Sequence, residues 1–290
     1  MAETLARRAW PATEETLGPW PVNDDVDGIA PRGIIYHVSK CGSTLVSQLL
    51  KRCGGVAVYS QPPAINDLLL PPHPGTPDDM IALLRALGAR LSRHAGGSYV
   101  LKLESWNVLF CDLIQRAFPQ TPWVFCIRDP VDVAVSVMED PDPVVWYRLR
   151  GCRDNPFMDL LGITPDASSC PGHYIALIYA AFCRAILQLD PSRGSIIAYD
   201  TMPRSIWTVA APAFGIALTP QQRAMLQQAA AFYSKEAPGS QRRFVSDSLD
   251  KRARAAIELR AVIERWARPA YEEVLAAACV GAERAVSIAE

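Results

Sequence analysis

Five short apolar segments, separated by helical patterns, constrain the fold of this chain more than any other feature. Because each segment is short and apolar on both faces, it has the character of a buried strand. Buried strands that alternate with helices indicate a parallel sheet covered on both sides. We therefore expect an α/β fold of three layers, with a central, mostly parallel sheet of about five strands flanked by helices. The five segments are 33–38, 56–59, 98–103, 122–127 and 194–199.

The remaining segments are expected to be helices and loops. Helical periodicity follows the first strand over 45–53 and recurs at 78–91 and 104–118, and helices dominate the end of the chain at 221–233 and 249–279. Prolines gather at 62–77 and at 140–171, which predicts loops there. We expect one domain over 1–290, with an N-terminal extension at 1–30.

Charge and cysteine content exclude several classes of protein. Lysine and arginine total 29 against 30 acidic residues, so the chain lacks the basic excess of a dedicated nucleic-acid or membrane-surface binder. Eight cysteines without a C-x-x-C spacing predict reduced, buried thiols such as Cys53, Cys126 and Cys183. The longest apolar run, 174–183, is about half a membrane span, and the first residues do not have a secretory pattern. We expect a cytoplasmic protein with no membrane or nucleic-acid partner.

The segment directly after the first strand has the composition of an anion site. It reads Ser39-Lys40-Cys41-Gly42-Ser43-Thr44 and leads into a helix. Backbone N–H groups at a helix start, a glycine, two hydroxyls and a lysine together favour a bound phosphate or sulfate. The lysine precedes the glycine by two residues, unlike the usual nucleotide-triphosphate loop. The alternative is an ordinary helix start with Ser43 or Thr44 as the cap.

Lys40-Cys41-Gly42-Ser43-Thr44 resembles the K-S-G-T-T loop of sulfotransferases that use 3′-phosphoadenosine 5′-phosphosulfate (PAPS). The resemblance implies a P-loop-type version of the expected fold. It also implies that residues Lys40, Cys41, Gly42, Ser43 and Thr44 hold the 5′-phosphosulfate group. Cys41 departs from the family pattern, which has serine there.

A second motif follows the fourth strand. Arg128, Pro130, Asp132 and Ser136 resemble the 3′-phosphate signature R-x-P-x-D-x-x-x-S of the same family. The resemblance implies that Arg128 and Ser136 bind the 3′-phosphate, and a guanidinium is well suited to that task because it donates two parallel hydrogen bonds. The alternative is a local salt bridge between Arg128 and Asp132.

Two further segments resemble the family more loosely. Tyr199, at the end of the fifth strand, matches a segment that packs near the adenine, although a core tyrosine fits as well. Arg242 and Arg243 lie where the family often has a basic loop over the 3′-phosphate, although a solvated basic turn fits equally.

The candidate general base follows the third strand. Glu104 stands where cytosolic sulfotransferases have the histidine of K-T-H, and some carbohydrate sulfotransferases use glutamate as base. Lys102 is assigned to the sulfuryl oxygens, with an ion pair to Glu104 as the alternative. His37 is the competing base, with a hydrogen-bonded core histidine as its alternative.

The resemblance implies transfer of a sulfuryl group from PAPS to a hydroxyl or amine of a small-molecule acceptor, giving PAP, with no metal. The acceptor side is expected at 1–30, 60–63 and 140–170, where Trp146, Tyr147, Phe157 and Met158 form either an aromatic lid or a packed surface loop. Homodimer formation is compatible with this interpretation. Two alternatives remain at this point: a P-loop kinase-like phosphotransferase, in which Asp129 would serve as a magnesium aspartate, and a non-catalytic, nucleotide-binding homologue.

Overall fold

A computed structural model describes residues 30–70, 75–152, 154–164, 170–230 and 247–288 of the chain. Nearly all of the expected N-terminal extension, together with Arg242 and Arg243, lies outside the described residues.

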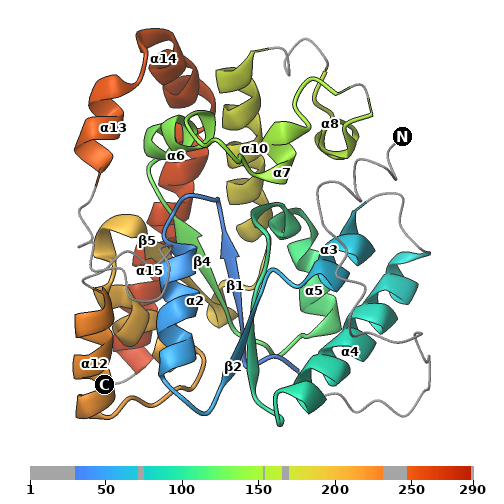
Figure 1. Ribbon diagram of the computed structural model, residues 1–290, viewed down its shortest axis with the longest axis vertical. Helices are drawn as coiled ribbons and strands as arrows, with labels where there is room; N and C mark the ends of the chain where they lie inside the picture. The colour runs from blue at the N-terminus through green and yellow to red at the C-terminus, as the bar shows by residue number, and fades with distance from the viewer. Residues whose placement is uncertain (1–29, 71–74, 153, 165–169, 231–246, 289–290) are drawn as a thin grey trace.

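The centre of the molecule is a five-stranded sheet in the order β2-β3-β1-β4-β5, with every adjacent pair parallel (Figure 1). This confirms the predicted fold class, and each strand falls within one residue of its predicted position. The strands are β1 (Gly33–His37), β2 (Ala57–Ser60), β3 (Tyr99–Lys102), β4 (Trp123–Ile127) and β5 (Gly194–Ala198).

Helices connect the strands and cover the sheet. Helix α2 (Ser43–Arg52) follows β1, and α3 (Pro63–Leu69) and α4 (Pro77–His94) lie between β2 and β3. The 3₁₀ helix η1 (Ser105–Phe110) and α5 (Cys111–Ala117) lead into β4. Between β4 and β5 come α6 (Pro130–Met138), α7 (Val145–Arg148), α8 (Pro156–Leu161), α10 (Pro171–Ile186) and η2 (Pro191–Arg193). After β5 come η3 (Tyr199–Thr201), η4 (Ile206–Ala210), α11 (Ala211–Ala213), α12 (Pro220–Ala230), α13 (Ser248–Arg254), α14 (Ile257–Trp266) and α15 (Arg268–Ile288).

Two local predictions were wrong. The proline-rich segments are not simply loops: α3 lies inside the first, and α7 and α8 lie inside the second. Proline is compatible with a helix at its first position, which is where Pro63 and Pro156 stand. The second error is the continuous helix over 249–279, which the structure divides into α13, α14 and α15. The backbone is non-helical at Ala255 and Ala256, and both helices on either side of this break, α13 and α14, pack on α6.

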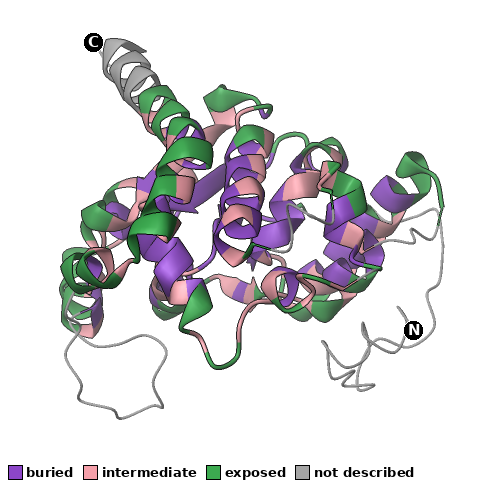
Figure 2. Cartoon of the chain, turned by 90° about the horizontal axis from the view of Figure 1, so that it is seen from above, coloured by how far each residue is buried: buried purple, intermediate pink, exposed green. Residues whose placement is uncertain are grey.

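The sheet and α10 form the core. Figure 2 shows the buried residues gathered at the centre, with exposed residues on the outer faces of the surrounding helices. The apolar run 174–183 lies within α10, where Tyr174, Ile178 and Phe182 are fully buried. Within the described ranges, no helix combines the length and the hydropathy needed to span a membrane. Cys53, Cys126 and Cys183 are buried thiols that form no disulfide, as predicted.

The strand order defines where a ligand site is expected. From β1 the chain continues to β2 on one side of the sheet, and from β4 it continues to β5 on the other side. The connections after the adjacent strands β1 and β4 therefore diverge, and such a divergence at the carboxyl ends of parallel strands leaves a crevice for ligands. Both predicted phosphate motifs follow these two strands.

Candidate active site

The turn between β1 and α2 has an unusual backbone. Ser39 and Lys40 have φ values of 72° and 49°, and Gly42 has a φ of 82°. The left-handed conformation is unfavourable for residues with a Cβ by roughly 1–2 kcal/mol each, and such strain clusters at functional sites. Strain at two consecutive residues indicates that the surrounding structure holds this turn in a specific shape.

Helix α2 begins without the usual polar cap. Its N-cap residue is Gly42; among the described residues no side chain caps this end, and no acidic residue stands in the first turn. Neither Ser43 nor Thr44 is the ordinary N-cap that the alternative interpretation required. The N–H groups and the positive end of the helix dipole are left without an internal carboxylate, as in an anion-binding helix start.

Gly42 is packed closely against the end of β5. A Cβ built on Gly42 would lie 2.8 Å from Sδ of Met202 and 3.2 Å from Cδ2 of Tyr199. Glycine is therefore required here both for its positive φ and for the close approach of the neighbouring side chains. The contact also brings Tyr199 to the turn, as its predicted role demands.

Cys41 faces inward from the turn. Its side chain is fully buried, and burial raises the pKa of its thiol, with Lys102 and Arg128 near enough to oppose that rise. The replacement of the family's serine by cysteine therefore alters an inward-facing side chain. For an anion at the turn, we expect Cys41 to offer only its backbone N–H.

Arg128 joins the two predicted motifs. Its Nη1 donates to the carbonyl oxygen of Lys40 at 3.2 Å, and its guanidinium carbon lies 4.0 Å from the centre of the Tyr199 ring. Its Nε donates to Asp132 at 3.3 Å, so the local salt bridge weighed above does form, as one contact of several. Arg128, Lys40 and Tyr199 are thus brought together although they lie on three different strand ends.

The positive charge of Arg128 is stabilised by neighbouring groups although the side chain is only 5% exposed. Burial lowers its pKa, but a hydrogen bond to Asp247 and the nearby Tyr199 and Asp132 raise it above its ordinary value on balance. Nη2 donates to Asp247 at 2.8 Å and to the hydroxyl of Ser248 at 2.9 Å.

Ser136 is held by its own helix. Its hydroxyl donates to the carbonyl oxygen of Asp132 at 2.6 Å. To bind a phosphate as predicted, this hydroxyl would have to exchange that bond.

Lys40 is paired with a carboxylate that the sequence analysis did not single out. Its Nζ forms an ion pair and hydrogen bond with Oδ2 of Asp140, which follows α6. The two side chains are 16% and 19% exposed, so the pair is shielded from most of the solvent.

Glu104 is close enough to Lys102 for the two charges to interact. Burial raises the pKa of the Glu104 carboxyl above its ordinary value, and this rise is only partly opposed by the charge of Lys102 and a hydrogen bond from Gln61. Lys102 itself is buried, and its carbonyl oxygen accepts from the N–H of Gln61. A carboxyl with a raised pKa is a stronger base than an exposed glutamate.

His37 connects the β1 turn to the end of β3. Its Nδ1 accepts from the N–H of Ser39 at 3.1 Å, and its Nε2 lies 2.9 Å from the carbonyl oxygen of Leu103. Because a carbonyl oxygen only accepts, Nε2 carries the proton. Both ring nitrogens are thus engaged in holding backbone, an arrangement typical of the core histidine that was the alternative to a base.

A second connection ties the same two strand ends. The hydroxyl of Ser39 donates to that of Ser105 at 2.6 Å, and Nε1 of Trp146 reaches Ser105 at 3.2 Å. Trp146 and Phe157 are 1% exposed, so they belong to the packed interior and do not form a lid.

Further arginines support the β4 motif and were missed in the sequence. Asp132 also accepts from Arg252 at 3.0 Å, and Asp129 accepts from Arg268 at 3.0 Å. The basic run 251–254 was the available signal for the first of these, but it stood inside a predicted helix. Asp140 and Asp247 were missed because lone acidic residues in polar segments carry no pattern.

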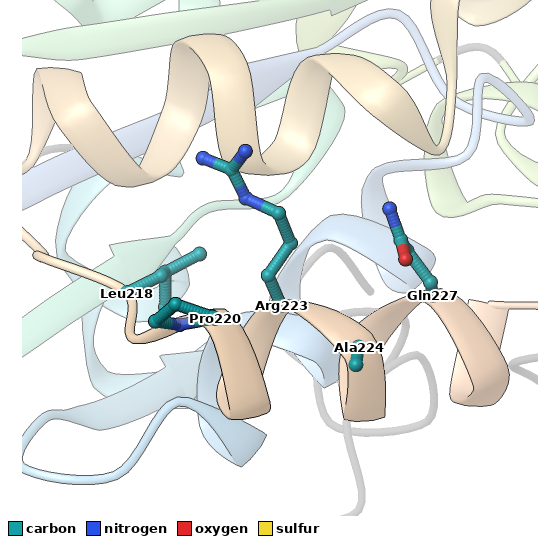
Figure 3. A pocket seen from close by; sticks show the side chains of 5 residues that line it. All are labelled: Leu218, Pro220, Arg223, Ala224 and Gln227. Carbon is teal, nitrogen blue, oxygen red and sulfur yellow. The ribbon is translucent and has the colours of Figure 1, made fainter.

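A hollow among the described residues lies away from these groups. It measures about 310 Å³ and is lined by Leu218, Pro220, Arg223, Ala224 and Gln227 (Figure 3). Nε2 of Gln222 donates to the carbonyl oxygen of Cys53, which places α12 at the end of α2 opposite to Gly42. The length of α2, about 15 Å, therefore separates the hollow from the turn.

No family model matches the chain, and no curated protein matches it. A search of solved structures found sulfotransferases. The sulfotransferase domain of the Synechococcus PCC 7002 olefin synthase has a TM-score of 0.49 and 17% identity, covering 86% of this chain and 98% of that one. Sulfotransferase STF9 from Mycobacterium avium has a TM-score of 0.48 and 14% identity, covering 82% and 76%. Mouse sulfotransferase SULT7A1, complexed with PAP, has a TM-score of 0.47 and 10% identity, covering 89% of each chain.

Proposed function

We propose that this chain is a sulfotransferase that moves a sulfuryl group from PAPS to a hydroxyl or amine of a small-molecule acceptor. The observation that supports this most directly is the hydrogen bond from Arg128 to the carbonyl oxygen of Lys40. This bond links the guanidinium of one predicted anion site to the backbone of the other at the diverging strand ends. A donor whose ribose carries one anionic group at the 3′ position and one at the 5′ position requires two such sites in proximity.

The residues at this edge fit such a donor. Lys40 and the N–H groups of residues 42–44 would hold the 5′ end, since the helix start has no acidic residue in its first turn. Arg128 would hold the 3′-phosphate, and Tyr199 offers a ring beside it. The donor, when bound, supplies a sulfuryl group activated by its link to phosphate.

The chemistry of the remaining residues follows from their positions. Glu104 accepts the proton of the acceptor hydroxyl or amine, and its raised pKa makes it competent for this task. Lys40 and the start of α2 stabilise negative charge that develops beside the turn, and each such preorganised donor is typically worth about 3–4 kcal/mol. Lys102 neutralises charge at the reacting centre. His37 acts as a positioning residue through its bonds to Ser39 and Leu103.

The kinase alternative has less support. Its magnesium aspartate would be Asp129, but this carboxylate caps α6 through the N–H of Val131 at 2.9 Å and accepts from Arg268 at 3.0 Å. Both oxygens of this carboxylate are thus already engaged, one in capping a helix and one in pairing with a cation.

Thermal shift and turnover measurements test the proposal. PAP is expected to raise the melting temperature of the wild-type chain, whereas ATP with Mg²⁺ leaves it unchanged. Turnover of labelled PAPS is measured over a panel of hydroxyl and amine acceptors. Lys40→Ala is expected to remain folded and lose turnover. Arg128→Lys keeps the charge but loses the forked geometry, so PAP affinity is expected to fall at least tenfold.

The matched control is Arg223→Ala, which removes a basic side chain from the remote hollow and is expected to leave PAP binding and turnover unchanged. Stabilisation by ATP with Mg²⁺ and not by PAP would favour the kinase. PAP binding without turnover on any acceptor would favour the non-catalytic homologue. Wild-type turnover by Lys40→Ala would remove that residue from the mechanism.

A further inference from the structure

Both cations of the proposed donor site are already paired with a carboxylate. Lys40 pairs with Asp140, and Nη2 of Arg128 donates to Asp247 at 2.8 Å. The two carboxylates come from different parts of the chain, one after α6 and one before α13, and neither stands on a strand. Arg128 also pairs with Asp132 of its own motif, but Asp140 and Asp247 belong to neither predicted motif, and their pairing with the two cations requires an explanation.

Asp140 is held in place for its contact with Lys40. Its Oδ1 accepts from the N–H of Asp142 at 3.1 Å, which leaves Oδ2 directed at Lys40. The following residue is proline, which restricts the backbone of Asp140. Asp142, two residues further on, is 88% exposed, whereas Asp140 is 19% exposed. The position of Asp140 therefore differs from that of an ordinary surface acid.

Asp247 makes an equivalent contact on the other side. Its Oδ1 accepts from Arg128, and its Oδ2 pairs with Lys251 one helical turn later. Burial raises the pKa of this carboxyl, but hydrogen bonds from Lys251 and Arg128 outweigh that effect and lower it, so the group is ionised. Its side chain is 44% exposed, so it can turn toward solvent without crossing the core.

We propose, on the basis of the proposed function, that Asp140 and Asp247 occupy the binding positions of the donor's two anionic groups until the donor binds. We call these two carboxylates placeholders. A carboxylate offers a cation the same kind of acceptor oxygens as a sulfate or phosphate. In the ligand-free chain the two carboxylates hold Lys40 and Arg128 in position, and the donor must displace both. The affinity of the chain for the donor is then lower than its cations alone would provide, because part of the binding free energy is used to release these pairs.

Substitution by asparagine separates charge from shape. Asp140→Asn keeps an oxygen for the N–H of Asp142 while losing the charge that holds Lys40. Asp247→Asn likewise keeps the shape of the side chain and loses the negative charge that pairs with Arg128. Glu139→Gln is the matched control, because Glu139 precedes Asp140, carries the same charge and pairs with Arg254 at the surface at 3.2 Å.

Calorimetric titration of PAP into the four proteins measures the effect. Asp140→Asn and Asp247→Asn are each expected to lower the dissociation constant about tenfold, equivalent to about 1.4 kcal/mol. Glu139→Gln is expected to change it less than twofold. Should Asp140→Asn fail to fold, Asp140→Ser replaces it in the series.

A second probe, inorganic pyrophosphate, separates this proposal from the proposed function. If PAP binds the wild type but neither asparagine variant binds it more tightly than Glu139→Gln does, the placeholder proposal is wrong and the function stands. If pyrophosphate stabilises Asp140→Asn more than the wild type while PAP binds no variant, the placeholder at Lys40 stands and the function is wrong. If neither probe binds any of the proteins, both proposals fall.

Discussion

Replacing Gly42 with alanine perturbs the β1 turn at the point where it meets Tyr199. Two costs are expected. The first is conformational, because alanine at a φ of 82° is unfavourable by roughly 1–2 kcal/mol. The second is steric, because the new Cβ would lie 2.8 Å from Sδ of Met202 and 3.2 Å from the Tyr199 ring. The methionine end can move aside, so overpacking is expected to add about 1 kcal/mol, at the low end of its usual range.

Gly54 provides a matched control at the other end of α2. Its φ is 74°, and a Cβ there would meet nothing within 4 Å. Gly54→Ala therefore carries the conformational cost without the steric one. Urea unfolding is expected to give a loss of about 1–2 kcal/mol for Gly54→Ala and about 1 kcal/mol more for Gly42→Ala.

The same pair of variants tests function. In Gly42→Ala, displacement of Tyr199 moves the ring against which Arg128 lies, so the affinity for PAP is expected to fall at least tenfold. Gly54→Ala is expected to bind PAP like the wild type. Equal unfolding free energies and equal PAP affinities for the two variants would refute the reasoning about this turn.

Two further predictions concern buried acids. Glu104 has a folded-state pKa above its ordinary value of 4.5, so its contribution to stability is present below that pH and is lost as pH rises through the folded value. Glu104→Gln is therefore expected to melt at a higher temperature than the wild type at pH 7 and to lose turnover. Wild-type turnover is expected to rise with pH through the same pKa. A lower melting temperature or retained activity in the variant would contradict this. Asp132→Asn leaves Arg128 and Arg252 without a shared buried carboxylate, so its free energy of unfolding in urea is expected to fall by about 3–5 kcal/mol. The control Asp142→Asn changes an exposed acid and is expected to cost less than about 0.5 kcal/mol. Similar losses for the two variants would contradict the prediction.

The strands could be predicted because their signal is local. Each is a short apolar run whose neighbours along the chain change to polar or helical patterns, and a buried parallel strand needs little else. The helix boundaries near the end of the chain were not predictable in the same way. The residues around Ala255 and Ala256 favour a helix by themselves, and the break between α13 and α14 is accompanied by packing of both helices against α6.

The candidate site was likewise predictable only in part. Lys40, Gly42 and Arg128 were predicted as members of two phosphate motifs from residue types, spacing and the resemblance to sulfotransferase motifs, all of which can be recognised in the linear sequence. The sequence did not indicate that Cys41 faces the core or that both nitrogens of His37 hold backbone. Those facts depend on side-chain direction, which the neighbouring elements decide.

From the amino-acid sequence alone, the parallel sheet could be determined, and anion binding at two strand ends could be predicted. Only the tertiary structure decided which charged side chains form ion pairs. Arg128 and Asp247 are 119 residues apart, and Lys40 and Asp140 are 100 apart, so no local pattern links either pair. An ion pair of this kind forms when the fold brings two segments together and excludes most of the water between them, and that is a property of packing.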